Sequence, residues 1–333
     1  MSRPRIAIAY GAICGGCDVS LVNTGEKLAE LLEKYDIIYW SIAVDGRRDI
    51  LENIDSIDVA IFMGSIRTSE HKELAKLLRE KARLRIAYGT CSIYGGIPGL
   101  AAIYRPSDIN KIVSETITTT IRDNNLNRPY KEGESLELPE LLEIPYPSID
   151  AFDPQILVPG CPPSVETVEN LIDILIEYTK GWRPESKIFL GEENENTLCS
   201  KCPRKPEDMT KIVMPGIYRL YEREIDENKC FLEQGILCMG PVTRLACKHQ
   251  CIKNNMPCIG CMGPVASIDD PGLKMLSSIA SLLLVDKEKT LLEKGLAREL
   301  DKIVDPHGMF YKYTLPSSLL MKIVLRRRGK DDL

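Results

Sequence analysis

This chain of 333 residues has few histidines, no excess of basic over acidic residues and no long apolar run. The three histidines present are His71, His249 and His307, too few for the mixed cysteine and histidine sites of many zinc proteins. Lys and Arg number 43 against 48 Asp and Glu, which gives a net charge of −5. Because no long basic run precedes the last ten residues, nucleic acid is not expected as a partner.

Signals for membranes and export are also missing. No segment approaches the ~18 consecutive apolar residues that a membrane-spanning helix needs. The first residues, MSRPRIAIAY, run directly into a strand-like stretch and leave no room for a signal peptide. We therefore expect a cytoplasmic protein without a membrane span, in a compartment where thiols stay reduced.

Cysteine, in contrast, is abundant, with 12 residues in the chain. Structural disulfides are disfavoured in a reducing compartment, so this number points to metal binding or catalysis. Twelve thiolates divide into three sets of four, and four is the number that one cubane iron–sulfur cluster takes. The arithmetic suggests three clusters without proving them.

Residues 1–182 alternate between strand-like and helix-like segments. Strands are expected at 5–10, 37–44, 58–66, 85–91 and 155–163, and helices at 21–35, 69–83 (capped by Ser69) and 164–181 (with Ser164 as N-cap). This alternation predicts an α/β fold with a flavodoxin-like, doubly wound parallel sheet. Between residues 106 and 154 the sequence becomes polar and contains proline, and we expect a long excursion with one helix at most.

A second region follows the linker-like stretches GWRPES and GEENENT. Residues 197–265 hold eight cysteines with little apolar periodicity, so bound metal rather than a large apolar core should supply the folding energy. Helical patterns then occur at 273–286 and 289–304. The predicted domains are the flavodoxin-like domain over 1–182, a small cysteine-rich domain over 183–265, and a C-terminal helical extension over 266–333.

Four cysteines fall where predicted strands end. Cys14 and Cys17 follow the first strand in the stretch YGAICGGCDVS, Cys91 ends the strand over 85–91, and Cys161 ends the strand over 155–163. Ligands of an open parallel sheet bind beyond these ends, so the four thiols should converge. Turn-forming residues surround them, namely Gly15, Gly16, Gly89, Gly95, Gly96, Gly160, Pro162 and Pro163. The glycines let the loops turn and let backbone N–H groups point at sulfur.

Other interpretations compete for this first set of cysteines. A thioredoxin-like dithiol also lies between a strand and a helix, but it needs no further cysteines at strand ends. Four-cysteine zinc is chemically possible, although such sites usually staple small loops. Buried cysteine without a ligand explains Cys91 or Cys161 singly, but it explains all four poorly.

The remaining eight cysteines lie close together in the sequence. Taken in sequence order they form two sets, Cys199, Cys202, Cys230 and Cys238, then Cys247, Cys251, Cys258 and Cys261. Their density predicts two further metal sites, with two zinc knuckles as the alternative. Ligands of two clusters can interleave, so the partition stays open. His249 lies inside the last set and is expected to be a bystander or a hydrogen-bond donor.

The motifs CGGCD, GTCSIYGGIPGL and PGCPPSVET together resemble the small subunit of nickel–iron hydrogenases, whose fold is shared with the cluster-bearing subunit next to the quinone site of complex I. The segment CFLEQGILCMGPVTRLACKHQCIKNNMPCIGCMGP resembles the C-terminal cluster domain of cytoplasmic archaeal hydrogenases. The similarity is greatest to the small subunit of the viologen-reducing hydrogenase that feeds electrons to heterodisulfide reductase. The closing DPHGMFYKYTLPSSLL is similar to that subfamily too.

The resemblance implies a role for each cysteine. The set Cys14, Cys17, Cys91 and Cys161 would hold a proximal [4Fe-4S] cluster facing a nickel–iron centre in a separate large subunit. The other eight would hold medial and distal [4Fe-4S] clusters that pass electrons to an outside acceptor, heterodisulfide reductase through an iron–sulfur adaptor. The chain alone would not split hydrogen.

Two departures from the family pattern stand out. Asp18 occupies the position after the second cysteine where hydrogenases often have Glu, and it is a candidate for a proton relay or an interface role. The stretch LACKHQC places Lys248 and His249 where small residues are common. Two alternative functions remain, a zinc-stabilised interaction or scaffold protein and a complex I-like cluster subunit. The latter predicts adjacent cysteines in the first motif and no eight-cysteine region.

Overall fold

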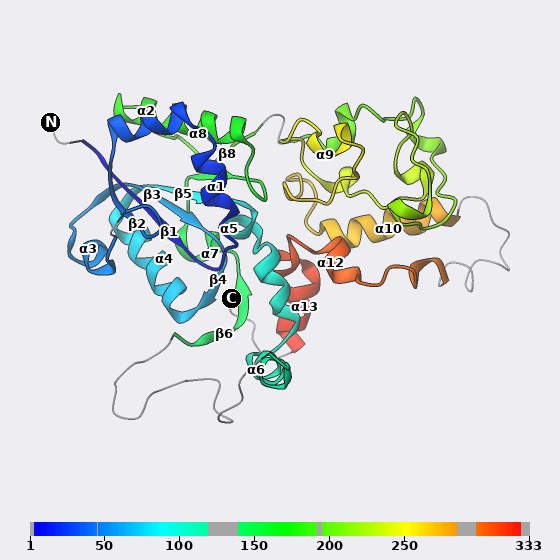
Figure 1. Ribbon diagram of the computed structural model, residues 1–333, viewed down its shortest axis with the longest axis horizontal. Helices are drawn as coiled ribbons and strands as arrows, with labels where there is room; N and C mark the ends of the chain where they lie inside the picture. Colours follow the sequence, from blue (N-terminus) through cyan, green and yellow to red (C-terminus); the bar gives the residue numbers. More distant parts are fainter. Residues whose placement is uncertain (1–2, 45, 119–138, 192–194, 285–297, 328–333) are drawn as a thin grey trace.

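The computed structural model describes residues 3–44, 46–118, 139–191, 195–284 and 298–327. A parallel sheet of six strands, in the order β2-β1-β3-β5-β7-β8, forms the N-terminal region (Figure 1). Its strands are β1 (Arg5–Tyr10), β2 (Asp36–Trp40), β3 (Ile57–Met63), β5 (Ala82–Tyr88), β7 (Ile156–Val158) and β8 (Ile188–Phe189). The predicted parallel α/β architecture is confirmed.

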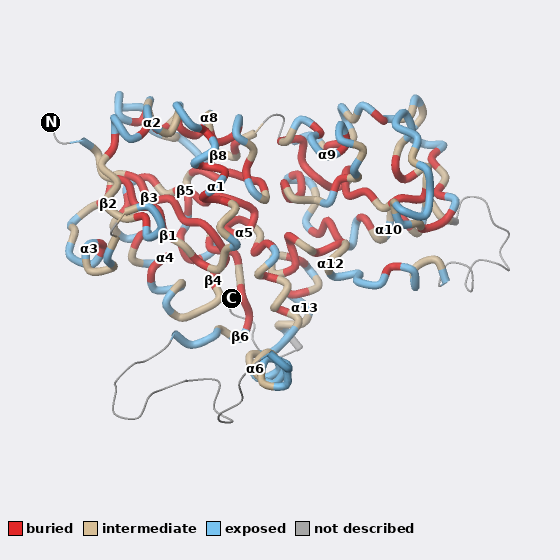
Figure 2. The backbone as a smooth tube through the Cα atoms, in the orientation of Figure 1, coloured by how far each residue is buried: buried red, intermediate tan, exposed pale blue. Residues whose placement is uncertain are grey.

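Helices cover both faces of this sheet (Figure 1). One face packs against α1 (Gly16–Val22), α2 (Glu26–Lys34) and α8 (Val165–Thr179), and the other against α3 (Arg48–Asn53), α4 (Ser69–Lys81) and α7 (Ile149–Phe152). Alternate residues of β1 serve the two faces: Ile6 and Ile8 pack toward α8, and Ala7 and Ala9 toward α4. The strands are therefore buried on both sides, as Figure 2 shows.

Two details of the helices differ from the sequence-based expectation. The predicted helix over 21–35 is two helices, because the chain turns at Asn23, Thr24 and Gly25 between α1 and α2. The cap of α4 is Thr68 rather than Ser69, since the Thr68 hydroxyl accepts a hydrogen bond from the His71 N–H at 3.3 Å. Ser164 caps α8 as predicted.

The excursion over 106–154 holds more structure than predicted. It contains α6 (Pro106–Glu115), β6 (Leu141–Tyr146) and the short α7, so the expectation of one helix at most is wrong. Strand β6 pairs antiparallel with β4 (Ile66–Thr68), outside the main sheet. A helix as short as α7 is missed because it gives no helical periodicity. Residues 119–138 of the excursion lie outside the described residues.

Short helices and irregular chain make up the region with eight cysteines (Figure 1). Its elements are the 3-10 helices η2 (Leu198–Lys201), η3 (Met209–Lys211), η4 (Leu220–Glu222), η5 (Leu232–Gln234) and η6 (Gly240–Val242), and the one-turn helix α9 (Gln250–Lys253). It nevertheless has an apolar core, contrary to the expectation, because helix α10 (Pro271–Leu284) contributes Met275 and Ile279 to it.

The C-terminal chain returns to the sheet. It forms α12 (Pro306–Phe310), η7 (Leu315–Ser317) and α13 (Leu319–Arg327), while most of the helix expected at 289–304 lies outside the described residues. The C-terminal chain packs there against two elements that follow β5, namely α5 (Thr90–Tyr94) and η1 (Ile97–Ile103). The Gly96 N–H donates to the Tyr313 carbonyl at 3.0 Å. The tail therefore packs against the loop that follows Cys91.

The helices that the structure describes are of moderate length. Helix α8 has 15 residues and α10 has 14. Within the described ranges, none of the helices combines the length and the hydropathy that crossing a membrane requires.

Candidate metal centres

The first four cysteines come together at the carboxyl edge of the sheet. Cys14 and Cys17 lie where β1 passes into α1, Cys91 lies in the first turn of α5 after β5, and Cys161 follows β7. Burial raises the pKa of the Cys17 thiol above its usual range, and the nearby Cys91, Cys161 and Cys14 thiols raise it further. Burial likewise raises the pKa of Cys91 to about 12, with Cys161 and Cys14 adding to the shift. The predicted convergence at the strand ends is therefore present.

Glycine leaves room beside the sulfurs of this set. Gly89 has a φ of 85°, and a Cβ added there would lie 2.6 Å from the Cys17 Sγ. Gly96 has a φ of 60°, and a Cβ there would collide with the Cys91 Sγ. Positive φ and close approach to sulfur are both conditions that only glycine meets without strain. The space around the thiols is therefore kept free of side chains.

Asp18 is buried beside the first set, with 4% of its surface exposed. Its Oδ1 accepts hydrogen bonds from the Tyr10 hydroxyl at 2.6 Å and from the Trp40 indole N–H at 3.0 Å. Sequence reasoning missed both donors; Tyr10 ends β1 and Trp40 ends β2, four residues earlier than the predicted strand. Two donors on one oxygen hold the carboxylate, and with it the first turn of α1 that carries Cys17, in one orientation.

Thiols among the other eight also lie near one another, as the causes of the raised pKa values of Cys199 and Cys261 show. Burial raises the pKa of Cys199 to about 12, and the nearby thiols of Cys202 and Cys230 raise it further. Burial raises the pKa of Cys261, and Cys258, Cys247 and Cys251 add to this shift. Cys258 also raises the pKa of Cys199 and of Cys238, so the partition in sequence order stays a prediction.

The sets also touch one another. The Cys258 N–H donates to the Cys238 Sγ at 3.4 Å, which links the two C-terminal sets. Cys161 contributes to the raised pKa of Cys261, which brings the sheet set next to the set of Cys247 to Cys261. The set that contains Cys261 therefore lies between the other two.

Backbone N–H groups point at several of these sulfurs. The Gly260 N–H donates to the Cys258 Sγ at 3.4 Å, and the Thr243 hydroxyl lies 3.6 Å from the same sulfur. N–H groups of His249 and Gln250 counteract the raised pKa of Cys247, as the Ile97 N–H does for Cys91. Such donors favour the charged thiolate over the thiol. These donors therefore offset part of the penalty that burial places on the thiolate.

The loop between Cys247 and Cys251 is strained. Lys248 and His249 have φ values of 48° and 61°, a left-handed conformation that is uncommon for residues other than glycine. The His249 Nε2 lies 2.7 Å from the Leu198 carbonyl, and because a carbonyl only accepts, Nε2 carries the proton. His249 is therefore a hydrogen-bond donor that ties this loop to the chain before Cys199. The Lys248 ammonium pairs with Glu166 on α8 at 2.5 Å.

The donor chemistry fits iron–sulfur clusters. All twelve cysteines are free thiols, and burial disfavours the charged form of Cys238 and of the other thiols whose pKa is raised, so deprotonation of these would accompany the binding of a cation. Across the described ranges, no three Cys, His, Asp or Glu side chains are arranged to hold a single metal ion. A cubane presents four separate iron corners to four thiolates, so a set of four neighbouring thiols meets its ligand requirement.

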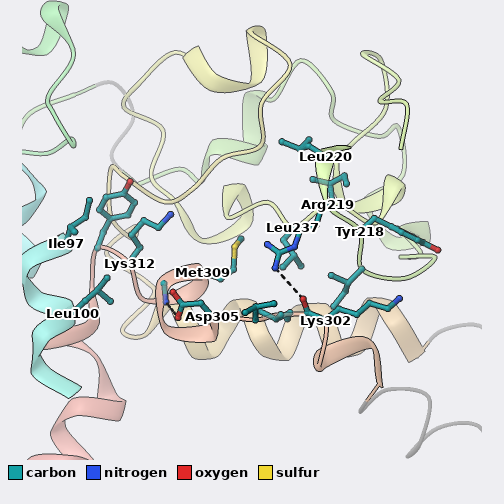
Figure 3. Close-up of a pocket in the computed structure, with 16 residues that line it drawn as sticks. Ile97, Leu100, Tyr218, Arg219, Leu220, Leu237, Lys302, Asp305, Met309 and Lys312 are labelled. Atoms are coloured by element: carbon teal, nitrogen blue, oxygen red, sulfur yellow. Dashed lines mark hydrogen bonds between the residues drawn. The ribbon is translucent and has the colours of Figure 1, made fainter. Parts of the chain in front are cut away.

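A separate groove of about 600 Å³ lies below the cysteine-rich region (Figure 3). The residues that line it include the apolar Ile236, Leu237 and Met309 and the basic Arg219 and Lys312. The size is that of an ordinary ligand or docking cavity. Cysteine is absent from the described residues that line it, so the groove is distinct from the thiol sets.

Comparison with known proteins identifies the family. A family model described as NADH ubiquinone oxidoreductase, 20 Kd subunit, matches residues 14–175. The G subunit of the F420-non-reducing hydrogenase of Methanothermobacter marburgensis is 35% identical over 325 residues, which span 95% of this chain and 96% of that protein. The chain belongs to the family of F420-non-reducing hydrogenase G subunits. The resemblance to archaeal hydrogenase subunits is confirmed.

A further relative and a solved structure agree with this assignment. The iron–sulfur G subunit of the F420-non-reducing hydrogenase of Archaeoglobus profundus is 33% identical over 317 residues, 93% of this chain and 95% of that protein. A solved NiFeSe hydrogenase from Desulfovibrio vulgaris Hildenborough aligns with a TM-score of 0.52 and 17% identity, over 79% of this chain and 94% of that one. That hydrogenase chain therefore shares the fold.

Proposed function

We propose that the chain is the electron-transfer subunit of a nickel–iron hydrogenase complex in the cytoplasm. Three [4Fe-4S] clusters bound to its twelve cysteines would supply one-electron transfer between a partner large subunit and an outside acceptor. The observation that carries this proposal is the convergence of Cys14, Cys17, Cys91 and Cys161 at one sheet edge, next to a second and a third set of thiols. Membership of the hydrogenase family supports it.

The first set would face the large subunit that contains the nickel–iron centre. Cys14 is exposed while Cys17 and Cys91 are buried, so this site opens to the surface at the loop of Gly15. The apolar side chains of Val19 and Val22 on α1 are also exposed beside it, at 58% and 53%. An apolar surface next to an open metal site suits a permanent protein interface.

The C-terminal sets would continue the path. Cys247, Cys251, Cys258 and Cys261 would hold the medial cluster, because Cys261 neighbours Cys161. The distal cluster would then be held by Cys199, Cys202, Cys230 and Cys238. In this proposal residues 1–182 carry the first site, 183–265 carry the other two, and 266–333 pack against both.

The protein's own contribution would be to set the environment of each site. Backbone N–H groups at Gly260, His249 and Ile97 stabilise negative charge on sulfur, which is one means by which a protein sets a reduction potential. Burial of Cys238 and Cys258 excludes water from the join between the C-terminal sets. For Asp18 we propose an orienting role, through Tyr10 and Trp40, at the turn that carries Cys17.

The outside acceptor in this proposal is heterodisulfide reductase, reached through an iron–sulfur adaptor. H2 oxidised in the large subunit yields protons and electrons, and the electrons would leave through this chain. A complex I-like role is less well supported, because the family model named for that complex ends at residue 175, before the eight C-terminal cysteines. A zinc-stabilised scaffold is the alternative without redox chemistry.

The test is anaerobic purification of the tagged chain with its native partners, followed by exposure to H2. We expect a nickel-containing large subunit to co-purify, and H2 to produce the EPR signals of reduced iron–sulfur clusters. A tagged chain that carries zinc, has no acid-labile sulfide and does not respond to H2 would overturn the proposal and favour the scaffold.

A further inference from the structure

The hydroxyl of Thr90 lies between two of the thiol sets. Thr90 directly precedes Cys91 and is 1% exposed. Its Oγ1 accepts a hydrogen bond from the Gly160 N–H at 3.1 Å and donates one to the Cys261 carbonyl at 2.5 Å. Gly160 directly precedes Cys161. One buried oxygen is therefore bonded to the backbone beside Cys161 and to the backbone of Cys261.

The position of this hydroxyl is tightly fixed. The Thr90 N–H donates to the Gly160 carbonyl at 2.8 Å, so Thr90 and Gly160 exchange hydrogen bonds in both directions. Thr90 is the first residue of α5 and its helix is capped by Gly89, so the hydroxyl is not used as a helix cap. The β-branched side chain has few rotamers, which keeps Oγ1 pointed at the Cys261 carbonyl.

Other contacts hold the two regions together without touching a cysteine. Arg244 donates to the Tyr94 hydroxyl at 3.0 Å, and its guanidinium lies 4.0 Å from the centre of the Phe189 ring. These contacts join the cysteine-rich region to α5 and β8. The contact of Thr90 is different, because both of its partners belong to backbone that carries ligand-type sulfur. Its geometry therefore fixes the position of one thiol set relative to the next.

We propose that Thr90 is a positioning residue that fixes the separation and orientation of the Cys14–Cys161 set relative to the Cys247–Cys261 set. Its side chain also completes a short bonded route from the Cys91 backbone, through Cβ and Oγ1, across one hydrogen bond to the Cys261 carbonyl. This inference rests on the proposed function, since the two sets matter as electron-transfer sites. It requires no additional ligand and no proton transfer.

The test compares two pairs of variants in the anaerobically purified complex. Thr90→Val replaces the hydroxyl by a methyl group of similar size. Thr90→Ser and Thr90→Ala differ from each other only in the hydroxyl. Thr24→Val is the matched control, because the buried Thr24 hydroxyl donates to a carbonyl, that of Leu21, within the sheet region. Three quantities are measured: iron and sulfide per chain, the magnetic interaction between reduced clusters in the EPR spectrum, and the rapid-freeze rate at which C-terminal clusters are reduced after mixing with H2.

We expect wild type, Thr90→Ser and Thr24→Val to give the same spectra and rates. Thr90→Val and Thr90→Ala should retain iron but show an altered magnetic interaction and slower transfer than wild type, because loss of the hydroxyl breaks the bonded route and leaves the Gly160 N–H and the Cys261 carbonyl without this partner. If Thr90→Val loses iron, the Ser and Ala pair decides the result.

Three results would overturn the inference: spectra and rates of the hydroxyl-free variants that match wild type, equal losses in Thr90→Ser and Thr90→Ala, or an equal loss in Thr24→Val. A wild-type chain without iron and sulfide is a different outcome, because it would remove the proposed function itself.

Discussion

The sheet region and the cysteine-rich region both gather thiols into sets of four, but they do so on different scaffolds. In the sheet region, β1, β5 and β7 are held by an aliphatic core in which Val59, Ile61 and Ile86 are fully buried. The cysteines follow the ends of these strands, and of them Cys17 also packs in this core. In the cysteine-rich region the thiols lie on loops and single-turn helices, and Cys238 and Cys258 are themselves part of the apolar core.

This difference indicates how each site depends on its metal. The sheet has its own hydrogen-bonded ladder and core, so its set of thiols is positioned before anything binds. The cysteine-rich region has an apolar core, but its elements are short and Lys248 and His249 are strained, so we expect bound clusters to add to its stability. The comparison therefore predicts one preorganised site and two sites that depend more on their metal.

Removal of iron should separate the two regions most strongly. An anaerobic chelator should unfold residues 198–265, because metal binding contributes on the order of 10 kcal/mol to the folding of small metal domains. The amides of β1, β3 and β5 should stay protected. Hydrogen exchange read by mass spectrometry gives the protection of each segment. Equal loss of protection in both regions would contradict the comparison.

A pair of cysteine substitutions should give the next largest effect. Cys17→Ala and Cys258→Ala should each remove about four irons per chain, the content of one cubane. Both cysteines pack in the core of their own region, but Cys258→Ala should lower the unfolding temperature of its region more, because the sheet keeps its hydrogen-bonded strands when its site is lost. Iron analysis and differential scanning calorimetry measure the two quantities. An unfolding temperature lowered as much by Cys17→Ala would show that the sheet site is not preorganised.

A pair of glycine substitutions sharpens the comparison within the sheet region. Gly89→Ala should lower the iron content of the first site, because its Cβ would lie 2.6 Å from the Cys17 Sγ and its φ is 85°. Gly16→Ala is the matched control, with a Cβ 3.5 Å from the Cys14 Sγ, an ordinary contact. We expect full iron in the control, and destabilisation by Gly89→Ala of about 1–3 kcal/mol from the strained backbone. Equal iron contents in the two variants would contradict the claim that Gly89 keeps the space beside the Cys17 sulfur free.

The smallest expected effect is the pH dependence of the sheet region. Burial lowers the pKa of His71, whose Nδ1 accepts a hydrogen bond from the Arg67 N–H at 3.4 Å in the neutral form. Below the unfolded pKa of ~6.5 the unfolded state takes up the proton first, so stability falls as the pH drops from there toward the folded pKa. His71→Gln should flatten this dependence in urea unfolding at pH 5 to 7. An unchanged slope would exclude His71 as its source.

The sheet and its set of thiols could be predicted because both follow from local rules. Alternating strand and helix patterns determine a parallel sheet, and the rule that ligands bind beyond its carboxyl edge places Cys14, Cys91 and Cys161 together. Local chemistry also identified Ser164 as a cap. The error at α4 arose because Thr68 and Ser69 are adjacent and equally able to cap a helix.

The contacts between the regions could not be predicted in the same way. Thr90 and Cys261 are 171 positions apart, and the hydroxyl of a threonine next to a cysteine gives no signal of its distant partner. Likewise Tyr313 lies near thiols of two sets only because the tail returns to the sheet. The core contributed by α10 was missed because its members are spread between the cysteine-rich segment and the following helix.

The most direct test of the account is the content of iron and acid-labile sulfide in the anaerobically isolated chain or complex. Three cubanes on twelve cysteines predict about twelve irons and about twelve sulfides per chain of this protein, with EPR signals from interacting clusters after reduction. Zinc in place of iron, with no acid-labile sulfide and no EPR signal after reduction, would contradict it.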